Sequence, residues 1–433
     1  MTAPDPASET DTTQAPQGPA VMSVEEAREL VFARVRRLEA ERVPILEALG
    51  RVLAEDLTSD TDVAPFDNSA MDGYAVHAED TVGATPDAPV SLEVVRHIAA
   101  GDFWEGTLER GQAARIMTGA PVPVGADAVV MVEFTSPTLV DVGRQVSVMR
   151  DAPVGQHIRK RGEEVHAGDV VLAAGEVMTS AAVGLAGSTG HATVPVYRRP
   201  RVAIISTGSE LVEIDQTPGP GKIRNSNSYS LAAQVIAAGG IPVRFGIVPD
   251  DEEATRQAFE EAAEGSDFIV TSGGVSVGDF DYVKPVLEEI GELAFCKVAM
   301  RPGNPQTLGS IHGTPFFGLP GNPTSTYVGF EIFVRPALRM MQGYSALERP
   351  HTRATLAHDV KKKQDRRYFL RARLERDPSG EFSVALSGSQ SSALLTAAHK
   401  GNCFMVLPGG EGFFAKGTEV DCIRLDIEEG TPL

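Results

Sequence analysis

The chain has 433 residues, of which 42% are hydrophobic and 23% charged, so it is long enough for two to four domains with sizeable cores. It has no run of about 18 apolar residues, which excludes a membrane-spanning helix, and its net charge of −20 argues against nucleic-acid binding. Cys296, Cys403 and Cys422 are scattered, which argues against a zinc site or disulfide framework and favours a reducing cytoplasm.

The amino-terminal region divides into a tail and a helix. Residues 1–21 are rich in proline and lack the basic and apolar regions of a signal peptide, so we expect a disordered tail. Ser23 and Glu26 have the spacing of a capping box. Apolar residues then recur at helical spacing as far as Leu38, which predicts one amphipathic helix to about Glu41. Its apolar stripe must be buried on the chain itself or on a partner chain.

Glycine, proline and short β-branched runs dominate the next part of the chain. Residues 61–162 are expected to form a β-rich domain, with a strand over 126–133 after turns at Pro121, Pro123 and Gly125. Residues 22–60 and 163–197 are expected to form a helical and β linker domain around it, and 163–197 are interpreted as short strands and turns.

Strands alternate with helices over 198–346. We predict strands at 201–206, 241–248, 267–272, 293–298 and 314–319, with helices at 228–238, from a cap at Asp250 to near Gly265, at 281–290 and from Asn322-Pro323 onward. This alternation predicts a central, doubly wound and mostly parallel α/β domain. Residues 347–433 show period-2 strands at 381–386, 402–407 and 423–427, which predict a small all-β domain. The fold class is therefore multidomain, α/β plus β.

The strongest motif is TSGGVSVGDFDYV (271–283), which follows a strand and precedes a helix. Ligands bind at this end of an open α/β sheet. Gly273 and Gly274 would let the backbone approach a phosphate, and the helix start would favour an anion. The hydroxyl and carboxyl groups of this motif suit phosphate and Mg²⁺; they belong to Ser272, Ser276, Asp279 and Asp281. The alternative is a tight turn with a capping aspartate.

Two further turns lie at strand ends of the same sheet. STGSEL (206–211) holds Glu210, and Asp250-Asp251 follows the next strand. These acids are expected to converge on one crevice, although Asp250 alone also fits a helix cap. GLPGNPTSTYV (318–328) has Pro320 and Pro323 at a helix start, which favours either an anion cradle or a purely structural turn.

Three motifs lie outside the α/β domain. HIRKRGEEV (157–165) gives a positive cluster, Arg159 to Arg161, that fits either an anion site or a solvated loop. FDNSAMDGYAV (66–76), with Asp67 and Asp72, and RIMTGAPVP (115–123), with Thr118, have loop composition. DRRYFLRAR (365–373) and SGSQSS (387–392) suggest a tetrahedral-oxyanion site built from Arg367, Arg371 and Arg373. The alternative is a row of arginines on an exposed strand face.

Six of these motifs, FDNSAMDGYA, IMTGAPVP, IRKRGEE, STGSEL, TSGGVSVGDFDY and GLPGNP, occur in this order. Together they resemble the molybdopterin molybdenumtransferase family, the MoeA-type molybdenum-insertion enzymes related to the E domain of gephyrin. The resemblance implies a four-part cytoplasmic subunit that forms a homodimer, with an α/β part like molybdopterin adenylyltransferase. It implies that adenylyl-molybdopterin and molybdate react, with Mg²⁺, to give molybdenum cofactor and AMP. Molybdopterin adenylyltransferase and molybdoenzymes are implied partners, whereas nucleic acid and membranes are not.

The resemblance also assigns residues. Catalytic roles are implied for Asp72, Thr118, Glu210, Asp250, Asp281 and Lys297, of which Glu210, Asp250 and Asp281 would handle the metal or pyrophosphate. Substrate binding is assigned to Arg159, Glu164, Ser272, Gly273, Gly274, Ser276, Arg301, Pro320, Pro323, Arg371, Ser391 and Ser392, with Arg371 and Ser391 or Ser392 in the molybdate pocket.

The sequence departs from the family pattern at three positions. Arg301 and Asn304 stand where lysines are frequent, and Glu164 stands where a shorter aspartate is sometimes seen. Arginine keeps the charge but offers a fork in place of a point charge. Two rival functions are an adenylyltransferase or nucleotide pyrophosphatase that shares the α/β domain, and a binding scaffold. The motifs in the flanking segments argue against the first, and the intact set of carboxylates and cations against the second.

Overall fold

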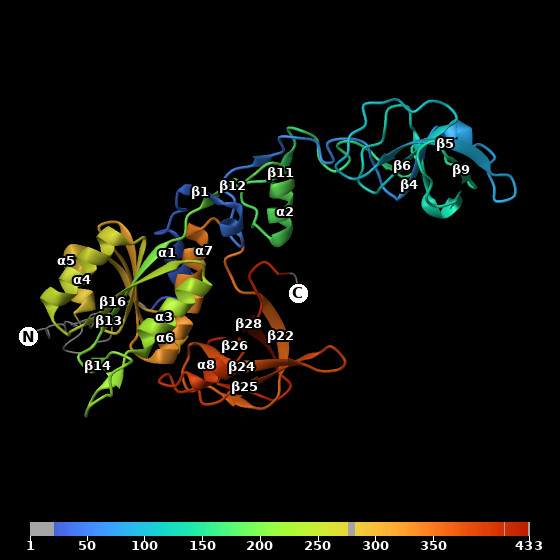
Figure 1. Cartoon of the computed structure of the whole chain (residues 1–433). Helices are drawn as coiled ribbons and strands as arrows, with labels where there is room; N and C mark the ends of the chain where they lie inside the picture. Colours follow the sequence, from blue (N-terminus) through green and yellow to red (C-terminus); the bar gives the residue numbers. More distant parts are fainter. Residues whose placement is uncertain (1–20, 276–281, 411, 432–433) are drawn as a thin grey trace, which may run out of the picture. The chain divides into compact units, whose positions relative to one another are not determined.

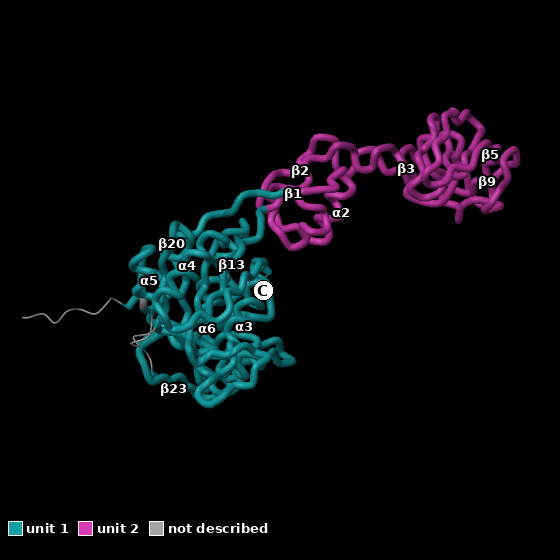
Figure 2. The backbone as a smooth tube through the Cα atoms, turned by 60° about the vertical axis from the view of Figure 1, so that its left-hand side comes forward, with its two compact units in different colours: residues 1–41, 197–433 teal, residues 42–196 magenta. Residues whose placement is uncertain are grey.

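The computed structural model describes residues 21–275, 282–410 and 412–431. The chain divides into two compact units, one of residues 1–41 and 197–433 and the other of residues 42–196 (Figure 2). The chain runs from one unit to the other through β1 (Ala40–Pro44) and returns through β12 (Thr193–Tyr197). Of the expected tail, residues 1–20 lie outside the described part of the chain. No helix within the described residues is both long and apolar enough to cross a membrane.

A six-stranded sheet forms the centre of the larger unit, in the order β16-β13-β17-β21-β20-β18. The first four strands are parallel, β20 is antiparallel to β21, and β18 is antiparallel to β20. The bounds are β13 (Arg201–Thr207), β16 (Ile241–Val248), β17 (Phe268–Ser272), β18 (Gly291–Lys297), β20 (Pro305–Ile311) and β21 (Thr314–Leu319). The predicted mostly parallel sheet is present, and β20 is an additional strand.

Helices cover both faces of this sheet, because alternate residues of each buried strand point to opposite faces. Val202 and Ile204 pack in one apolar cluster, and Ala203 and Ile205 pack in another. Figure 1 shows α4 and α5 on one side of the sheet and α3 and α6 on the other. Their bounds are α3 (Ser226–Ala237), α4 (Glu252–Gly265), α5 (Val283–Ile290) and α6 (Pro323–Gly329).

The first helix is shorter than predicted. The capping box of Ser23 and Glu26 is confirmed, but α1 spans Val24–Phe32 and does not continue to Glu41. Val35 and Leu38 remain buried in the non-helical segment that follows, and the Leu38 N–H donates to the Met341 carbonyl at 2.8 Å. The apolar stripe therefore packs on the α/β domain of its own chain, and it gives no indication of a partner surface.

The last helix of the α/β domain changes its winding in the middle. α6 begins with Pro323 after the cap Asn322, as predicted, and is followed by a π-helical turn over Phe330–Val334 and by α7 (Arg335–Met341). A π turn holds one residue more than an α-helical turn. The π turn therefore sets which way α7 faces relative to α6.

The carboxyl-terminal part is a small β-barrel, which confirms the predicted all-β domain. Its strands pair in the order β24-β25-β22-β28-β26, and β24 also pairs with β26. Strand β19 (Met300–Arg301) of the α/β domain adds to β24 in parallel. The barrel elements are β22 (His351–Leu356), β23 (Val360–Lys361), β24 (Arg367–Arg376), β25 (Phe382–Leu386), α8 (Thr396–Lys400), β26 (Cys403–Leu407), β27 (Phe413–Phe414) and β28 (Glu419–Arg424).

The smaller unit holds a six-stranded sheet in the order β7-β4-β6-β5-β9-β8. Its strands are β4 (Gly73–Val76), β5 (Val90–Ile98), β6 (Gln112–Ile116), β7 (Ala128–Met131), β8 (Thr135–Ser136) and β9 (Gln145–Val148). A helix, α2 (Ser180–Ser188), lies where only strands and turns were expected, with Thr179 as its cap. The short strands of this unit are β2 (Leu57–Thr58), β3 (Asn68–Ser69), β10 (Ile158–Arg159) and β11 (Val170–Leu172).

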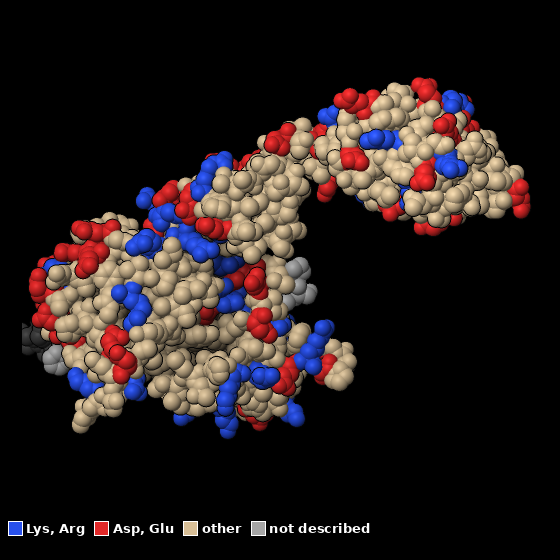
Figure 3. Space-filling model, in the orientation of Figure 1, with Lys and Arg blue, Asp and Glu red and all other residues tan. Residues whose placement is uncertain are grey.

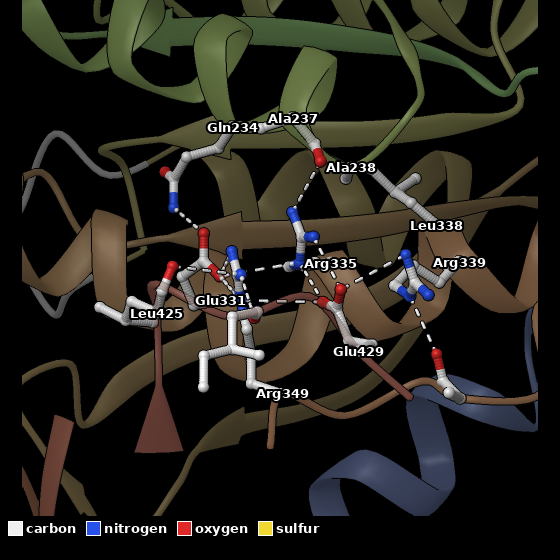
Figure 4. A network of polar contacts seen from close by, with 12 residues as sticks. Gln234, Ala237, Ala238, Glu331, Arg335, Leu338, Arg339, Arg349, Leu425 and Glu429 are labelled. Atoms are coloured by element: carbon white, nitrogen blue, oxygen red, sulfur yellow. Dashed lines mark hydrogen bonds and ion pairs between the residues drawn. The ribbon is translucent and has the colours of Figure 1, made fainter. Parts of the chain in front are cut away.

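Buried ion pairs join α7 to the segment after the barrel (Figure 4). Arg335 Nε contacts Glu429 Oε1 at 2.6 Å, and the Glu429 side chain is 1% exposed. Arg339 contacts the other Glu429 oxygen at 3.4 Å. Arg349 contacts Glu331 at 3.2 Å. We call these five side chains the α7 latch. Removing one partner of a buried pair leaves an uncompensated charge, so the latch is sensitive to single substitutions.

We expect Glu429→Ala to lower the free energy of unfolding by about 3 kcal/mol, because Arg335 and Arg339 would lose their shared carboxylate. Burial raises the pKa of Glu429, but the Arg335 hydrogen bond and the Arg335 and Arg339 charges outweigh it and leave the pKa below 4.5. The stabilisation is thus full above pH 4.5 and is lost as the pH falls through the lowered pKa. Urea unfolding at several pH values measures both effects.

The neighbouring substitution Glu428→Ala is the control, because Glu428 is exposed. It should leave the free energy of unfolding within about 0.5 kcal/mol of the wild-type value. Equal losses for the two variants would show that the latch has no special role in stability.

Candidate functional site

Three glycine- or proline-containing turns meet at the carboxyl edge of the central sheet. The Gly273 N–H donates to the Leu319 carbonyl at 3.0 Å, and Gly273 has a φ of 101°. A Cβ at Gly273 would lie 2.5 Å from the Thr207 carbonyl oxygen, so only glycine fits here. Asn227 Nδ2 donates to Ser272 Oγ at 2.7 Å and to the Gly321 carbonyl at 2.8 Å. These hydrogen bonds and close approaches therefore hold the three turns together at one edge of the sheet.

Several polar atoms at or next to this edge are buried and have no hydrogen-bond partner among the described residues. They include Thr207 Oγ1, Thr271 Oγ1 and Asn227 Oδ1. Buried polar groups in native proteins are nearly always hydrogen-bonded, so an unpaired set calls for a ligand or ordered water. The edge therefore offers two hydroxyls and an amide oxygen to a polar ligand.

The two described acids of the predicted metal site lie on adjoining turns. The Ser209 N–H donates to Asp250 Oδ2 at 2.8 Å. Asp251, and not Asp250, caps α4, so the simple capping interpretation of Asp250 is wrong. The Glu210 carboxylate folds back over Gly208, where a Cβ would lie 2.5 Å from Glu210 Oε2.

The remaining acids of this prediction cannot be placed. Ser276, Asp279 and Asp281 lie outside the described residues. In the described part of the chain, no group of three or more His, Cys, Asp or Glu side chains is placed to hold a metal ion.

A cavity of about 490 Å³ lies between this edge and the barrel. It brings together four predicted residues, Arg301, Pro320, Arg371 and Ser392. Its other cations are Lys361, Lys363 and Arg366, and none of its described lining residues is acidic. In a chain of net charge −20, five cations without a carboxylate make a local site for anions. We call it the anion cavity.

Arg371 is the most deeply buried cation of the anion cavity, with 1% exposure. Its Nη2 donates to the Ser391 carbonyl at 3.2 Å, and its Nε has no partner among the described residues. Burial, together with the nearby Arg301 charge, lowers the pKa of Arg371 to about 10. A buried guanidinium beside a second cation, with no carboxylate, is costly unless an anion binds.

The expected cluster of three arginines on β24 is only partly present. Arg371 lies in the anion cavity, but Arg367 pairs with Glu25, and Arg373 pairs with Glu375 at 3.0 Å. All three stand on the outer face of the barrel, and only the Arg371 position is covered. The loop that contains Ser391 contacts Arg371, whose Nη2 donates to the Ser391 carbonyl. The α/β domain holds this loop, because the Thr324 N–H donates to the Ser392 carbonyl at 2.9 Å.

Sequence reasoning missed three cations of the anion cavity, Lys361, Lys363 and Arg366. The signal was available as the basic run KKKQDRR (361–367). Lys297 ends β18 opposite Pro305, at the same edge of the sheet, but it does not line the cavity. Asn304 has a structural contact, because its Nδ2 donates to the Val298 carbonyl at 2.6 Å. Pro323 begins α6 beside the cavity turn.

The smaller unit gathers its own motifs at one place. Asp72 Oδ1 accepts hydrogen bonds from both the N–H and the hydroxyl of Thr118, each at 2.8 Å. The Ala70 N–H donates to the His157 carbonyl, so the loop of the motif at 157–165 lies beside the motif at 66–76. The hydrogen bond from the Thr118 N–H makes the largest contribution to lowering the pKa of Asp72, and the bond from the Thr118 hydroxyl makes the next largest. Together they hold this pKa below its usual value. Asp72 is therefore an exposed carboxylate that stays ionised.

The basic cluster of this unit is largely neutralised. Lys160 Nζ contacts Asp67 at 2.8 Å, and Arg161 pairs with Asp62. Arg159 on β10 and Glu164 are exposed. Within the described residues Arg159 makes no ion pair, so it is the cation of this cluster that remains available to a ligand.

Comparison with known proteins identifies the family. Three family models match: the MoeA N-terminal region (domains I and II) at 22–190, a probable molybdopterin binding domain at 203–340, and the MoeA C-terminal region (domain IV) at 353–425. The molybdopterin molybdenumtransferase of Bacillus subtilis is 40% identical over 412 residues, which is 94% of this chain and 95% of that protein. The chain belongs to the molybdopterin molybdenumtransferase family.

Other relatives agree with this assignment. Molybdopterin molybdenumtransferase 2 of Mycobacterium tuberculosis is 42% identical over 92% of this chain and 98% of its own length. The solved structure of the molybdopterin biosynthesis MoeA protein from Pyrococcus horikoshii matches with a TM-score of 0.81 and 34% identity, covering 94% of this chain and 100% of that one. The MoeA-type resemblance and the predicted multidomain fold class are thus confirmed.

In this family member, we expect Thr118→Ala to raise the pKa of Asp72 part of the way toward its usual value. The variant removes the hydroxyl hydrogen bond and keeps the larger contribution of the Thr118 N–H. Carbon NMR titration of the Asp72 carboxyl measures the shift. Thr107→Ala, at an exposed position of the same unit, is the control. An unchanged Asp72 pKa in Thr118→Ala would contradict the hydroxyl bond.

Proposed function

We propose that this chain inserts molybdenum from molybdate into adenylyl-molybdopterin, releasing AMP and molybdenum cofactor. The observation that carries the proposal is the anion cavity, which places the buried, carboxylate-free Arg371 beside the carboxyl edge of the α/β sheet. The family supports molybdopterin as the substrate class. Molybdate is a tetrahedral dianion, and guanidinium forks match the geometry of such oxyanions.

Different residues would bind the two anions, molybdate and the phosphates of adenylyl-molybdopterin. Arg301 and Arg371, with the cavity lysines, would hold molybdate. The Ser272–Gly274 turn, whose glycines let a ligand approach the backbone closely, and the start of α6 would lie against the phosphates. The adenylyl phosphorus takes an oxygen from molybdate or water, and its bond to the phosphate oxygen of molybdopterin breaks, so that AMP leaves. Fixed cations at this edge would stabilise the charge that develops.

We propose Mg²⁺ as the metal, because the available donors are hard carboxylate oxygens. Mg²⁺ is usually bound by one or two carboxylates together with substrate phosphates and water. Asp250 and Glu210 lie on adjoining turns and offer these oxygens, and Asp281 is the third proposed ligand. The metal would neutralise phosphate charge, and Asp250 is oriented for this by the Ser209 N–H.

Two alternatives remain distinguishable. An adenylyltransferase or nucleotide pyrophosphatase needs only the α/β domain, whereas the family models cover the flanking regions as well. A binding scaffold would not need a buried unpaired arginine. Incubation with adenylyl-molybdopterin, molybdate and Mg²⁺, while AMP and molybdenum cofactor are followed, tests the proposal. AMP release without molybdate and without cofactor formation would favour the pyrophosphatase.

For the metal, we expect Asp281→Asn to slow AMP release by about 10²-fold or more with little loss of thermal stability. The change keeps the shape of the side chain and removes a carboxylate charge. Asp279→Asn, two residues earlier in the same motif, is the matched comparison and should have a smaller effect. Activity of Asp281→Asn within a few-fold of wild type would show that Asp281 is not a ligand.

We further propose that the protein acts as a cytoplasmic homodimer. The family resemblance supports this assembly, and a two-fold dimer would contain two equivalent clefts. Each cleft would combine the Asp72 region of one subunit with the α/β domain of the other.

A further inference from the structure

A second cavity, of about 870 Å³, lies at the opposite edge of the central sheet. Its wall includes Ser266 and Asp267, just before β17, and the turn His312-Gly313, just before β21. Parallel strands start at this edge and end at the edge that carries the anion cavity. The segment 33–39 that follows α1 forms another part of the wall, together with Arg198 and Met341. We call this space the arginine cavity.

The acids of the arginine cavity are already engaged. Arg198 donates from Nη1 and Nη2 to the two Asp267 oxygens, each at 2.5 Å, and its Nε pairs with Glu39. Asp267 also accepts the Arg201 N–H at 2.8 Å. Both carboxylates of the wall are therefore hydrogen-bonded, and Arg198 offsets one of their two negative charges.

Three further arginines of the wall have no carboxylate partner within the described residues. Arg34 Nη1 donates to the Leu30 carbonyl at 3.3 Å, and Arg37 Nη1 donates to the Tyr197 hydroxyl at 3.2 Å. No hydrogen bond or ion pair of Arg36 is present in the described part of the chain. Counted over its described residues, the wall therefore has a net positive charge.

The early end of α1 creates this arrangement. Beyond Phe32 the chain is no longer helical, and the buried Val35 and Leu38 fix it against the core. Arg34 precedes Val35, and Arg36 and Arg37 stand between the two anchors; all three line the cavity. Figure 3 shows several basic side chains close together on the visible face near β1, with acidic side chains among them.

An unpartnered polar atom also points to a ligand. Ser266 Oγ is buried without a hydrogen-bond partner in the described structure, and Ser266 lines the cavity. His312 also lines the cavity and is exposed at a turn where its φ is 48°. A hydroxyl and an imidazole can both donate hydrogen bonds to phosphate oxygens. Ser266 and His312 therefore add two donors to those of the three arginines.

We propose that the arginine cavity binds a small oligophosphate, either free or as part of a nucleotide. Guanidinium groups bind phosphate oxygens through paired N–H donors, and three of them suit a ligand with two or more phosphates. The volume lies in the range of small-molecule sites. Because the cavity is at the edge opposite the anion cavity, its ligand is an effector and takes no part in the proposed reaction.

Calorimetric titration of the full chain with inorganic pyrophosphate at low salt tests the proposal. The anion cavity and the phosphate-receiving turns at the opposite edge also attract pyrophosphate. The titration is therefore done in an Arg371→Met background and fitted to separate sites, and the site in question is the one that responds to substitutions in the arginine cavity. Adding Arg34→Gln, Arg36→Gln and Arg37→Gln should weaken that site at least about tenfold. Arg36→Gln alone, which breaks no hydrogen bond or ion pair between described residues, should weaken it several-fold and serves if the combined variant fails to fold.

The matched control removes three exposed arginines of the smaller unit, Arg96, Arg144 and Arg150, by the same change to Gln. It alters the net charge equally and should leave pyrophosphate affinity unchanged. Unchanged binding in Arg36→Gln and the combined variant, or equal weakening in the control, would overturn the proposal.

Two further ligands identify the source of the phosphates. ATP that binds as tightly as pyrophosphate indicates a free oligophosphate ligand, and ATP that binds more tightly indicates a nucleotide; both support the site. Adenosine should not bind. Adenosine binding that survives in the combined variant would contradict recognition through phosphate.

Discussion

Arg371→Met should lose most of its affinity for molybdate while the protein becomes equally or more stable. Loss of a buried, charge-paired group weakens binding of its partner by about 2–5 kcal/mol, so the molybdate concentration needed for insertion should rise roughly 10²-fold or more. In the free protein the same guanidinium is buried without a carboxylate and beside Arg301. Replacing it with an apolar chain removes that cost and should add up to about 2 kcal/mol of stability.

Titration with molybdate and with adenylyl-molybdopterin, together with thermal unfolding, separates these effects. Arg373→Met is the matched control, because Arg373 lies on the same strand but is exposed and paired with Glu375. It should bind both ligands as the wild type does. Equal weakening of both ligands in Arg371→Met would place Arg371 outside the molybdate pocket.

Mixing two inactive variants should restore activity if the cleft is shared between subunits. We expect Asp72→Asn and Asp281→Asn each to be nearly inactive alone. In a mixed dimer, one cleft carries both lesions and the other carries neither. With random pairing, roughly a quarter of all clefts are intact, so AMP release should recover toward that fraction of the wild-type rate.

The control for this experiment is the mixture of Asp72→Asn with Thr118→Ala. Asp72 and Thr118 contact each other within one chain, so both lesions fall on the same region of the cleft. Every cleft then carries a lesion, and mixing should rescue nothing beyond the Thr118→Ala activity. Absence of rescue for Asp72→Asn with Asp281→Asn, with mixed dimers confirmed by mass spectrometry, would rule out a shared cleft.

The α/β domain was the easiest part to predict, because its strands are continuous apolar runs. The predicted strands 241–248 and 314–319 match β16 and β21 to the residue. β20 was missed because the segment from Pro305 to Ile311 contains polar and glycine residues. The strand forms nevertheless, because β18 and β21 on its two sides make antiparallel hydrogen bonds with its backbone. α2 was missed for a related reason, since its alanines and glycines give little helical periodicity.

The end of α1 and the identity of the α4 cap required tertiary information. Val35 and Leu38 keep the helical spacing, but a hydrogen bond to Met341 draws the chain away from the helix. Asp250 and Asp251 are equivalent cap candidates in the sequence, and only the contact of Asp250 with Ser209 separates them.

The anion cavity was only partly visible in the sequence. Arg371 alternates with Arg367 and Arg373, so its burial depends on which part of the barrel surface the loop at Ser391 covers. The loop is held by a contact between the barrel and the α/β domain, the hydrogen bond from Thr324 to Ser392. The spacing of residues along one strand does not predict such a contact. Lys361 and Lys363, by contrast, belong to an evident basic run. They lie far from Arg301 in the sequence, so the sequence did not show that all three line one cavity.

Because of the π turn at Phe330–Val334, the orientation of α7 depends on the exact number of residues in this segment. Each residue of a helix advances the direction of the next by about 100°. Deleting one residue from this turn would restore regular winding but rotate Arg335 and Arg339 away from Glu429, while Thr324 kept its contact with the barrel loop. Single-residue insertions and deletions should therefore be purged from this segment during evolution, even where substitutions are accepted.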